Sequence, residues 1–269
     1  MKESPSVVAE VAAAEAEDLA WRALLDWRRG GPPAALPGAR GAAALLDLYG
    51  PLVAGAAWLP CAVAHLAQSL DGKIACLGGA SRWLSGEEDL LHAHRMRALA
   101  DAVVVGARTV EHDDPQLTVR RCPGEHPVRV VIDPELRLSL RHRVFRDEAA
   151  PTLVIAASDR APTGERHGNA EIVAVPRGAG GLDPHEIRAA LAKRGLYRLF
   201  IEGGGVTISR FLAARALDRL QIIVAPVLLG SGRPSIMLPE IAEPRHGLRP
   251  RIRRVMFGDD VMFECIFDA

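Results

Sequence analysis

Short apolar runs and longer stretches with helical spacing follow one another along most of the chain. From residue 61 the short runs read CAVAHLAQ, DAVVVG, VRVVID, TLVIAAS, EIVAVP and RLFIEGGG, and such uninterrupted runs are typical of parallel strands buried on both faces. Helical segments lie between them at 86–100, 183–195 and 206–217; the first begins with acidic residues, and the second has an aspartate cap and a closing glycine. This alternation predicts an α/β fold with a mostly parallel sheet and helices on both faces.

The two ends of the chain follow different patterns. At the C-terminal end, LQIIVAPVLLG and RIRRVMFGDDVMFECIFDA are interpreted as late strands, the last two joined by a hairpin at GDD, which predicts an antiparallel edge. At the N-terminal end, 7–29 and about 42–49 have helical spacing, and the Gly- and Pro-rich segment 30–38 separates them. We therefore expect a helical extension over 1–58, whose role the sequence does not indicate, and a main domain over 59–269.

The composition is that of a soluble globular protein, with 49% hydrophobic and 25% charged residues. Lys+Arg and Asp+Glu are both 33, so the charge balance gives no reason to expect nucleic acid or a membrane surface as a partner. Four scattered cysteines without a CxxC pair, and an N-terminus without a signal peptide, suit the cytoplasm. The uncharged stretch 48–70 contains prolines, a histidine and a glutamine, so we expect a buried loop and strand there and no membrane span.

Three consecutive glycines in IEGGGVTISRFL mark a candidate phosphate site. An apolar strand leads to Gly203, Gly204 and Gly205, and the helix that follows presents its positive end and free N–H groups to the same spot. A tight strand-to-helix turn that needs positive φ would have the same sequence. The spacing differs from the G-x-G-x-x-G fingerprint, and we favour the ligand interpretation.

Charged residues near strand ends are further candidates. Glu202 ends an apolar strand at its carboxyl end, where open α/β sheets bind ligands, unless it is only the last solvated position. Arg97, on the helix at 86–100, either extends along the surface or reaches a phosphate. The segment GARTVEHDDPQLTVRR is expected to be a loop after the strand DAVVVG. Alone its charges would be solvated, but its place at a strand end favours ligand binding.

The segments SLDGKIA and LGGASRWLS supply a turn and a flexible loop. The Asp-Gly turn comes directly after a buried strand, and the loop offers glycines, hydroxyl groups and one indole, that of Trp83. Such a loop would suit a lid over a planar ring, since aromatic side chains stack on rings. An ordinary loop with a packing tryptophan is equally compatible with this sequence.

Together these segments resemble the reductase domain of riboflavin biosynthesis, the C-terminal domain of a bifunctional deaminase-reductase. The motifs SLDGKIA, SRWLS, HRMRALADAVVVG, TVEHDDPQLTVR, VRVVID, IEGGG and APVLLGSG occur in the family's order and approximate spacing, from about residue 61 to the C-terminus. The resemblance implies a dihydrofolate-reductase-like, three-layer α/β fold, whose mostly parallel central sheet has antiparallel edge strands.

The resemblance also implies a reaction. Family members use NADPH to reduce 5-amino-6-(5-phosphoribosylamino)uracil, or its diaminopyrimidinone counterpart, by hydride transfer to C1′ of the ring-opened ribose. By resemblance, the cofactor would be bound by Ala67, Trp83, Thr109, Asp113, Gly204, Gly205, Val206 and Thr207. The substrate would be held by Ser81, Arg97, Leu117, Arg120 and Glu202, with the two arginines on its phosphate. Lys73 and Glu202 are the candidate proton donors, Arg121 is expected to be solvated, and no metal is expected.

Two departures from the family pattern bear on this assignment. The zinc deaminase signature H-x-E…P-C-x-x-C is missing, since Cys61 continues as Val-Ala-His, so no deaminase activity is expected. Pro134 follows VVID where some relatives have a hydroxyl residue near the cofactor, so NADH is kept as the less favoured cofactor. The competing functions are a same-fold reductase of another heterocycle, such as a pterin or a specialised metabolite, and a non-catalytic nucleotide-binding protein. Retention of both Arg97 and Arg120 favours a phosphorylated substrate.

The predicted β-rich tail also bears on assembly. An apolar edge strand such as VMFECIF invites pairing with another chain when it is uncovered. A homodimer is therefore expected, as the family suggests.

Overall fold

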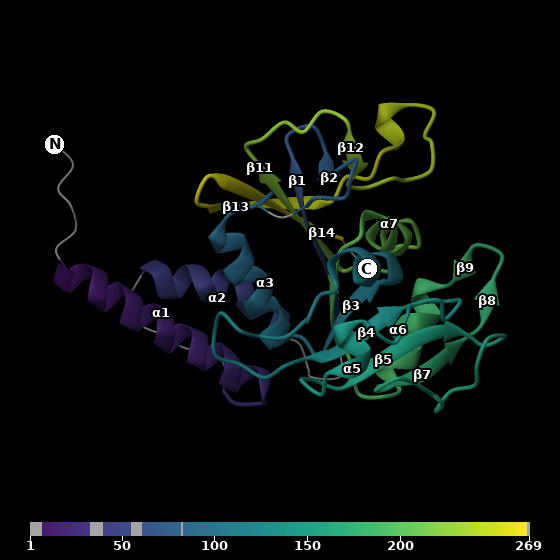
Figure 1. The fold of residues 1–269 in the computed structure, drawn as a ribbon. Helices are drawn as coiled ribbons and strands as arrows, with labels where there is room; N and C mark the ends of the chain where they lie inside the picture. The colour runs from purple at the N-terminus through teal and green to yellow at the C-terminus, as the bar shows by residue number, and fades with distance from the viewer. Residues whose placement is uncertain (1–6, 33–39, 55–60, 82, 268–269) are drawn as a thin grey trace. The chain divides into compact units, whose positions relative to one another are not determined.

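The computed structural model describes residues 7–32, 40–54, 61–81 and 83–267. The chain divides into two compact units, Met1–Leu59 and Pro60–Ala269. Most of the Gly- and Pro-rich segment at 30–38 lies outside the described residues. Figure 1 draws the elements of both units.

Two helices make up the described part of the N-terminal unit, α1 (Val7–Arg28) and α2 (Arg40–Val53). Trp21 of α1 and Tyr49 of α2 are buried, and their rings meet edge to face with centroids 5.7 Å apart. The second helix continues past Pro51, so the expectation of a loop over its last residues was wrong. Its last turns keep Leu48, Tyr49 and Val53 buried, and this packing outweighs the hydrogen bond that the proline removes.

A sheet of ten strands forms the centre of the larger unit, in the order β13-β14-β11-β1-β10-β3-β4-β5-β7-β6. Neighbouring strands from β11 to β7 are all parallel, whereas β13, β14 and β6 run antiparallel to their neighbours. The predicted mostly parallel sheet with antiparallel edge strands is therefore confirmed (Figure 1). The parallel strands are β11 (Arg219–Ala225), β1 (Cys61–Ser69), β10 (Arg198–Glu202), β3 (Ala102–Gly106), β4 (Val128–Ile132), β5 (Thr152–Ala157) and β7 (Ala170–Val175).

The C-terminal hairpin forms one edge of this sheet. As GDD predicted, β13 (Arg251–Phe257) and β14 (Asp260–Ile266) are joined by a tight turn, in which Gly258 has φ 58°. β14 pairs with β11 on one side and with β13 on the other, so VMFECIF is an inner strand and its expectation as the edge was wrong. β13 takes the edge, where Ile252 and Met256 are 48% and 63% exposed.

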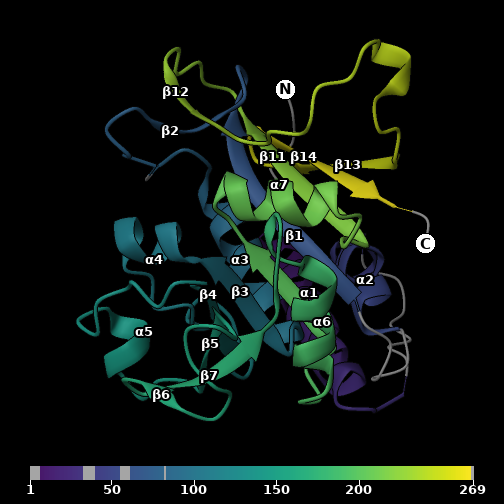
Figure 2. The same cartoon turned by 90° about the vertical axis from the view of Figure 1, so that its right-hand side faces the viewer.

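Helices cover both faces of the sheet. The longer helices of this unit are α3 (Glu87–Leu99), α6 (Pro184–Ala192) and α7 (Gly205–Ala213). Ile187 of α6 and Phe211 of α7 share one hydrophobic core with Leu66 and Ile201 of the central strands. His65, which precedes Leu66 in β1, points to the opposite face of the sheet and contacts Asp89 of α3. Figure 2 shows α6 and α7 in front of the sheet and α3 behind it.

Shorter elements connect these layers. They are α4 (Ala107–Asp113), α5 (Arg143–Arg146), the 3₁₀ turn η1 (Pro244–His246), β6 (Arg166–His167), the pair β2 (Lys73–Cys76) and β12 (Gly232–Pro234), and the pair β8 (Arg177–Gly178) and β9 (Gly181–Leu182). The predicted cap of α6 is present, since the side chain of Asp183 accepts a 2.8 Å hydrogen bond from the backbone N–H of His185.

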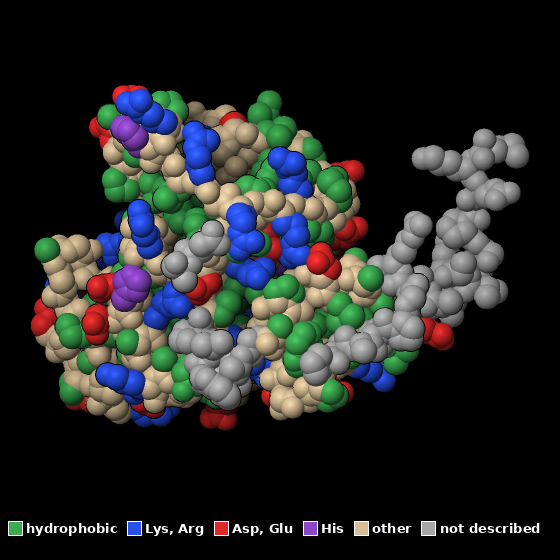
Figure 3. Space-filling view, turned by 180° about the vertical axis from the view of Figure 1, so that it is seen from behind, with side chains coloured by type: hydrophobic (Ala, Val, Ile, Leu, Met, Phe, Trp, Pro, Cys, Tyr) green, Lys and Arg blue, Asp and Glu red, His purple; other side chains and the backbone are tan. Residues whose placement is uncertain are grey.

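Charged side chains of both signs are mixed on the face drawn in Figure 3, with basic side chains most numerous near its middle. Within the described ranges, no helix is long and apolar enough to cross a membrane. The same ranges bring together no group of three or more side chains of the kinds that hold a metal ion.

Candidate active site

A cavity of about 1290 Å³ lies at the carboxyl ends of the central strands. Its walls include the ends of β1, β3 and β10, residues of α4, and the start of α7. This is where open α/β sheets form a crevice for ligands. The predicted site residues that line the cavity are Ala67, Ser81, Thr109, Asp113, Leu117, Glu202, Gly204, Gly205, Val206 and Thr207. The predicted residues that lie outside its lining are Lys73, Trp83, Arg97 and Arg120.

The turn from β10 to α7 brings the backbone to the cavity wall. Gly204 has φ 47° and ψ 124°, a conformation that residues with side chains rarely adopt. Gly205 opens the helix, and a methyl group on it would lie 2.0 Å from the backbone oxygen of Ser235. The turn itself therefore requires glycine. Because the helix start also lines the cavity, the phosphate interpretation stays a prediction.

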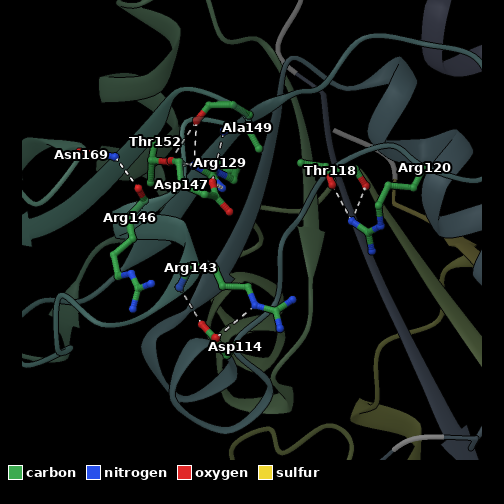
Figure 4. Close-up of polar contacts among 11 residues, drawn as sticks. Asp114, Thr118, Arg120, Arg129, Arg143, Arg146, Asp147, Ala149, Thr152 and Asn169 are labelled. Atoms are coloured by element: carbon green, nitrogen blue, oxygen red, sulfur yellow. Dashed lines mark hydrogen bonds and ion pairs between the residues drawn. The ribbon is translucent and has the colours of Figure 1, made fainter.

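The segment GARTVEHDDPQLTVRR is helical up to Asp113, so the expectation of a loop was wrong for that part. α4 ends at Asp113, and the residue that caps it, Asp114, has φ 40° and donates its N–H to the carbonyl of Val110 at 3.0 Å. The Asp114 carboxylate accepts a 2.8 Å hydrogen bond from the N–H of Arg143, which fixes this helix end (Figure 4). Because the helix begins directly at the end of β3, Thr109 and Asp113 reach the cavity from one short element.

Arg97 and Glu202 form an ion pair between α3 and β10. The Arg97 Nη2 donates to Glu202 Oε2 at 2.6 Å, Nε donates to Oε1, and Nη1 donates to the carbonyl of Thr118 at 3.0 Å. Their side chains are 12% and 14% exposed. Burial lowers the pKa of Arg97, but the charge of Glu202 outweighs it and the net shift is upward. The guanidinium is thus engaged with protein groups, and Glu202 is the member of the pair that lines the cavity.

Arg120 lies on the extended segment after α4 and is exposed. Its Nη1 donates to the hydroxyl and the carbonyl of Thr118, at 2.5 and 3.3 Å (Figure 4). Its backbone N–H donates to Nδ1 of His94 at 2.9 Å. Burial and the charge of Arg97 lower the pKa of His94 to about 4, so this imidazole is a neutral acceptor at pH 7. The next residue, Arg121, pairs with Glu87 at the surface.

The Asp-Gly turn after β1 is held by its aspartate. Asp71 accepts hydrogen bonds from the hydroxyl of Ser69 at 2.6 Å and from the N–H groups of Leu229 and Gly230 at 3.0 and 2.7 Å. These donors, the Ser69 hydroxyl first, lower the pKa of Asp71 to about 2. The carboxylate therefore ties the SLDGKIA turn to the segment APVLLGSG, which is far from it in sequence.

The residues expected near this turn take different positions. Ser81 lines the cavity. Trp83 is 86% exposed and has φ 68°, so its indole covers no ring here and its lid role stays a prediction. Lys73 begins β2, beside Gly232 of β12, where a methyl group would lie 3.2 Å from its Cβ.

His65 and Asp89 form a buried pair that the sequence did not indicate. The acids at the start of α3 were interpreted as favourable to the helix dipole, but Asp89 is 4% exposed and its Oδ1 lies 3.1 Å from Nε2 of His65. Burial lowers the pKa of His65, yet the nearby carboxylates, that of Asp89 first, outweigh burial, and the net shift is upward. The same contact lowers the pKa of Asp89, although burial alone would raise it.

Arginine side chains also line the cavity where it extends toward β8 and β9. Arg177 pairs with Glu135 at 2.5 Å and with Asp159 at 3.2 Å, which offsets its charge. Arg137 and Arg210 are exposed, and a methyl group at Gly181 would lie 3.2 Å from the guanidinium of Arg210. A cavity with these groups at one end can accept an anionic ligand.

A mostly parallel sheet with helices on both faces and a cavity at the carboxyl strand ends places this protein among the α/β proteins with an open sheet and a ligand crevice at its edge. The chain belongs to the family of the RibD C-terminal domain, whose model matches residues 60–255. The resemblance inferred from the motifs is thereby confirmed.

Relatives support the same family. The chain is 38% identical over 215 residues to the 2,5-diamino-6-ribosylamino-4(3H)-pyrimidinone 5′-phosphate reductase of Methanothermobacter thermautotrophicus, covering 76% of this chain and 97% of the relative. It is 38% identical over 167 residues to the riboflavin biosynthesis protein RibD of Aquifex aeolicus, covering 62% of this chain but only 46% of that protein.

Among solved structures, the deaminase/5-amino-6-(5-phosphoribosylamino)uracil reductase of Thermotoga maritima superposes with a TM-score of 0.65 at 28% identity, over 84% of this chain and 61% of that one. The riboflavin biosynthesis reductase Rib7 of Saccharomyces cerevisiae, at 19% identity and a TM-score of 0.61, shares the fold over 78% of this chain and 90% of that one. The predicted fold class is confirmed by these likenesses.

Proposed function

We propose that this protein reduces 5-amino-6-(5-phosphoribosylamino)uracil, or its diaminopyrimidinone counterpart, with NADPH, by hydride transfer to C1′ of the ring-opened ribose. The observation that carries the proposal is the match to a reductase of this name along 97% of its length, at 38% identity. The cavity supports it further, because the most specific motifs, DDPQLTVR and EGGG, both supply residues to its wall.

The residues around the glycine turn fit a dinucleotide cofactor. A methyl group on Gly203 would meet no atom within 4 Å, so open space borders the turn where α7 begins. The hydroxyls of Thr109 and Thr207 and the carboxylate of Asp113 line the same cavity, next to backbone N–H groups at a helix start. The nicotinamide, when bound, supplies the hydride, and these groups orient it.

The preference for NADPH over NADH is part of the proposal. Arg137 and Arg210 are exposed on the cavity lining and suit a 2′-phosphate, because a guanidinium binds phosphate oxygens with paired donors. Pro134, which brings no hydroxyl, lines the cavity as well. The comparison of NADPH with NADH as the varied cofactor tests this, and equal kcat/KM for the two would contradict it.

Four residues on or near the cavity wall are proposed to bind the substrate. Ser81 and Leu117 line the cavity and would contact the pyrimidine and the sugar, and Glu202 would accept hydrogen bonds from ribose hydroxyls. Arg120, exposed beside Thr118, is the proposed phosphate ligand. Arg97 holds Glu202 in place, since each of its three nitrogens donates to a protein acceptor.

The test is oxidation of NADPH at 340 nm with the phosphoribosylamino-pyrimidine, comparing wild type with Arg120→Ala and Arg121→Ala. The two arginines are adjacent, but Arg121 pairs with Glu87 at the surface. We expect turnover by wild type and Arg121→Ala, and a KM raised at least tenfold in Arg120→Ala, because a phosphate loses its charged donor. Binding of NADPH without turnover by wild type would refute the proposal in favour of another heterocycle or a non-catalytic role.

A homodimer and a cytoplasmic location complete the proposal. The exposed Ile252 and Met256 on the edge strand β13 offer a surface that a second copy could cover. All four cysteines are free, as reducing surroundings require. Light scattering on the purified protein gives the mass, and a monomer at micromolar concentration would contradict the dimer.

A further inference from the structure

His65 is almost fully buried and yet belongs to the cavity wall. Its Nε2 faces Asp89, while its Nδ1 has no hydrogen-bond partner in the described part of the chain. Buried polar atoms without a partner are rare in native proteins, and each one calls for a ligand, a water or a catalytic role as its explanation. The position at the cavity wall points to a role toward the substrate.

Polar groups surround His65 on every element packed against it. In the sheet, Glu202 of β10 and Gln221 of β11 are its register partners on either side. From α3, Asp89 pairs with it and His92 lies beside it, with ring centroids 5.3 Å apart. Two carboxylates, those of Asp89 and Glu202, thus favour a charged imidazole at this position.

The pKa values of the neighbouring His65 and His92 are shifted in opposite directions. Burial and the nearby His65 lower the pKa of His92 to about 3, and its Nε2 makes a 2.9 Å hydrogen bond with Gln221 Oε1. Gln221 continues the polar row to Glu264, which Arg219 and Arg253 neutralise. His92 is therefore a neutral hydrogen-bonding group, whereas the pKa of His65 is shifted upward by its carboxylate neighbours.

The other candidate acids are placed less well for proton donation. Both oxygens of Glu202 accept hydrogen bonds from the Arg97 guanidinium, so the side chain is already engaged with a protein donor on each oxygen. Lys73 lies outside the cavity lining. A charged His65, by contrast, has a proton on Nδ1 with no protein acceptor.

We propose that His65, positioned by Asp89, donates the proton that completes the reduction, an inference that rests on the proposed function. In this step C1′ of the substrate imine accepts the hydride, the π electrons of the C=N bond move to nitrogen, and that nitrogen takes the Nδ1 proton of His65. The imine is reduced to a secondary amine and NADPH is oxidised to NADP⁺. His65 is left neutral and regains a proton from water.

The test is the pH profile of single-turnover NADPH oxidation for wild type, H65Q and D89N. In wild type we expect the rate constant to fall as pH rises through the pKa of His65. In D89N the fall should move to lower pH, because the carboxylate that stabilises the imidazolium is gone. In H65Q the rate constant should drop by about 10²- to 10⁴-fold, the usual contribution of a general acid, and the fall should disappear.

Folding and cofactor binding are controlled separately. H65Q leaves the buried Asp89 carboxylate without its cation, so the double variant H65Q/D89N, which places a neutral amide pair there, is measured beside it. Both should bind NADPH with unchanged Kd. NMR titration of the histidine ring protons provides a readout without turnover, in which D89N should lower the midpoint of His65.

The outcomes separate the two hypotheses. A folded H65Q/D89N variant with the rate constant and pH profile of wild type would overturn the role of His65 and leave the reductase function intact. An unchanged His65 midpoint in D89N would overturn the positioning role of Asp89. Wild type that never oxidises NADPH with the pyrimidine would refute the proposed function, and the role of His65 with it.

Discussion

Replacement of Arg97 by methionine tests whether the Arg97–Glu202 pair holds the site together. The change keeps much of the side-chain volume but removes both donors to Glu202 and the donor to the Thr118 carbonyl. It leaves a carboxylate that is 14% exposed without its cation. Stability should therefore fall, because a stranded charge cannot recover its hydration at this depth.

The size of the effect follows from this burial. Breaking a buried pair by removing one partner costs about 3–5 kcal/mol. Glu202 borders the cavity, where water reaches one side of it, so we expect the lower end, about 3 kcal/mol. For a protein of this size each kcal/mol lowers Tm by about 2–4 °C, which gives a fall of about 6–12 °C.

The assay is urea unfolding followed by circular dichroism, with Arg121→Met as the matched control. Arg121 also pairs with a glutamate, but the two side chains are 44% and 66% exposed. Its replacement should cost less than about 1 kcal/mol. The double variant R97M/E202Q should regain part of the loss, since no charge is then stranded. If the free energy of unfolding falls no more in R97M than in R121M, the Arg97–Glu202 pair does not hold the site together.

Three further changes have defined outcomes. At neutral pH, Asp71→Asn should reduce the protection of the Leu229 and Gly230 amides against hydrogen exchange, and unchanged protection in the variant would contradict this. Because the pKa of Asp71 is depressed in the folded protein, wild type should lose the same protection only as pH falls from 3.8 toward about 2. Gly205→Ala should lower Tm and abolish NADPH binding, because its Cβ would lie 2.0 Å from a backbone oxygen, whereas Gly180→Ala, with free space, should change neither. Arg129→Met, which removes buried hydrogen bonds to Thr152 and Asp147 at 2.8 and 2.5 Å (Figure 4), should cost about 3 kcal/mol in the same urea assay, and a loss under 1 kcal/mol would refute that.

The sheet was predictable because each of its central strands has a local sequence pattern that is typical of a buried strand. Runs such as DAVVVG and TLVIAAS are uninterrupted and bounded by polar or turn residues, so both became buried parallel strands. α4 escaped prediction because ARTVEHD mixes charged and β-branched residues and is only seven residues long. The wrong strand was predicted to be the edge of the sheet, because the turn residues of a hairpin show that two strands pair but do not show which of the two pairs with the rest of the sheet.

The site was predictable only where one motif supplies the residue. The glycine turn and DDPQLTVR placed Gly204, Asp113 and Leu117 on the cavity wall, as the motifs indicated. The pairing of Arg97 with Glu202 joins residues 105 positions apart, and no local pattern encodes it. His65 sits in an apolar strand and pairs with Asp89 of a helix that follows later in the chain, so only the packed structure reveals the pair.

The most direct test of the proposed function is the fate of the hydride. Wild-type protein is incubated with NADPH deuterated at C4 on the transferred face and the phosphoribosylamino-pyrimidine, and the product is analysed by mass spectrometry and NMR. We expect a ribitylamino product that carries one deuterium at C1′, with equimolar NADP⁺. Recovery of unchanged pyrimidine and reduced cofactor, or deuterium on the pyrimidine ring, would contradict it.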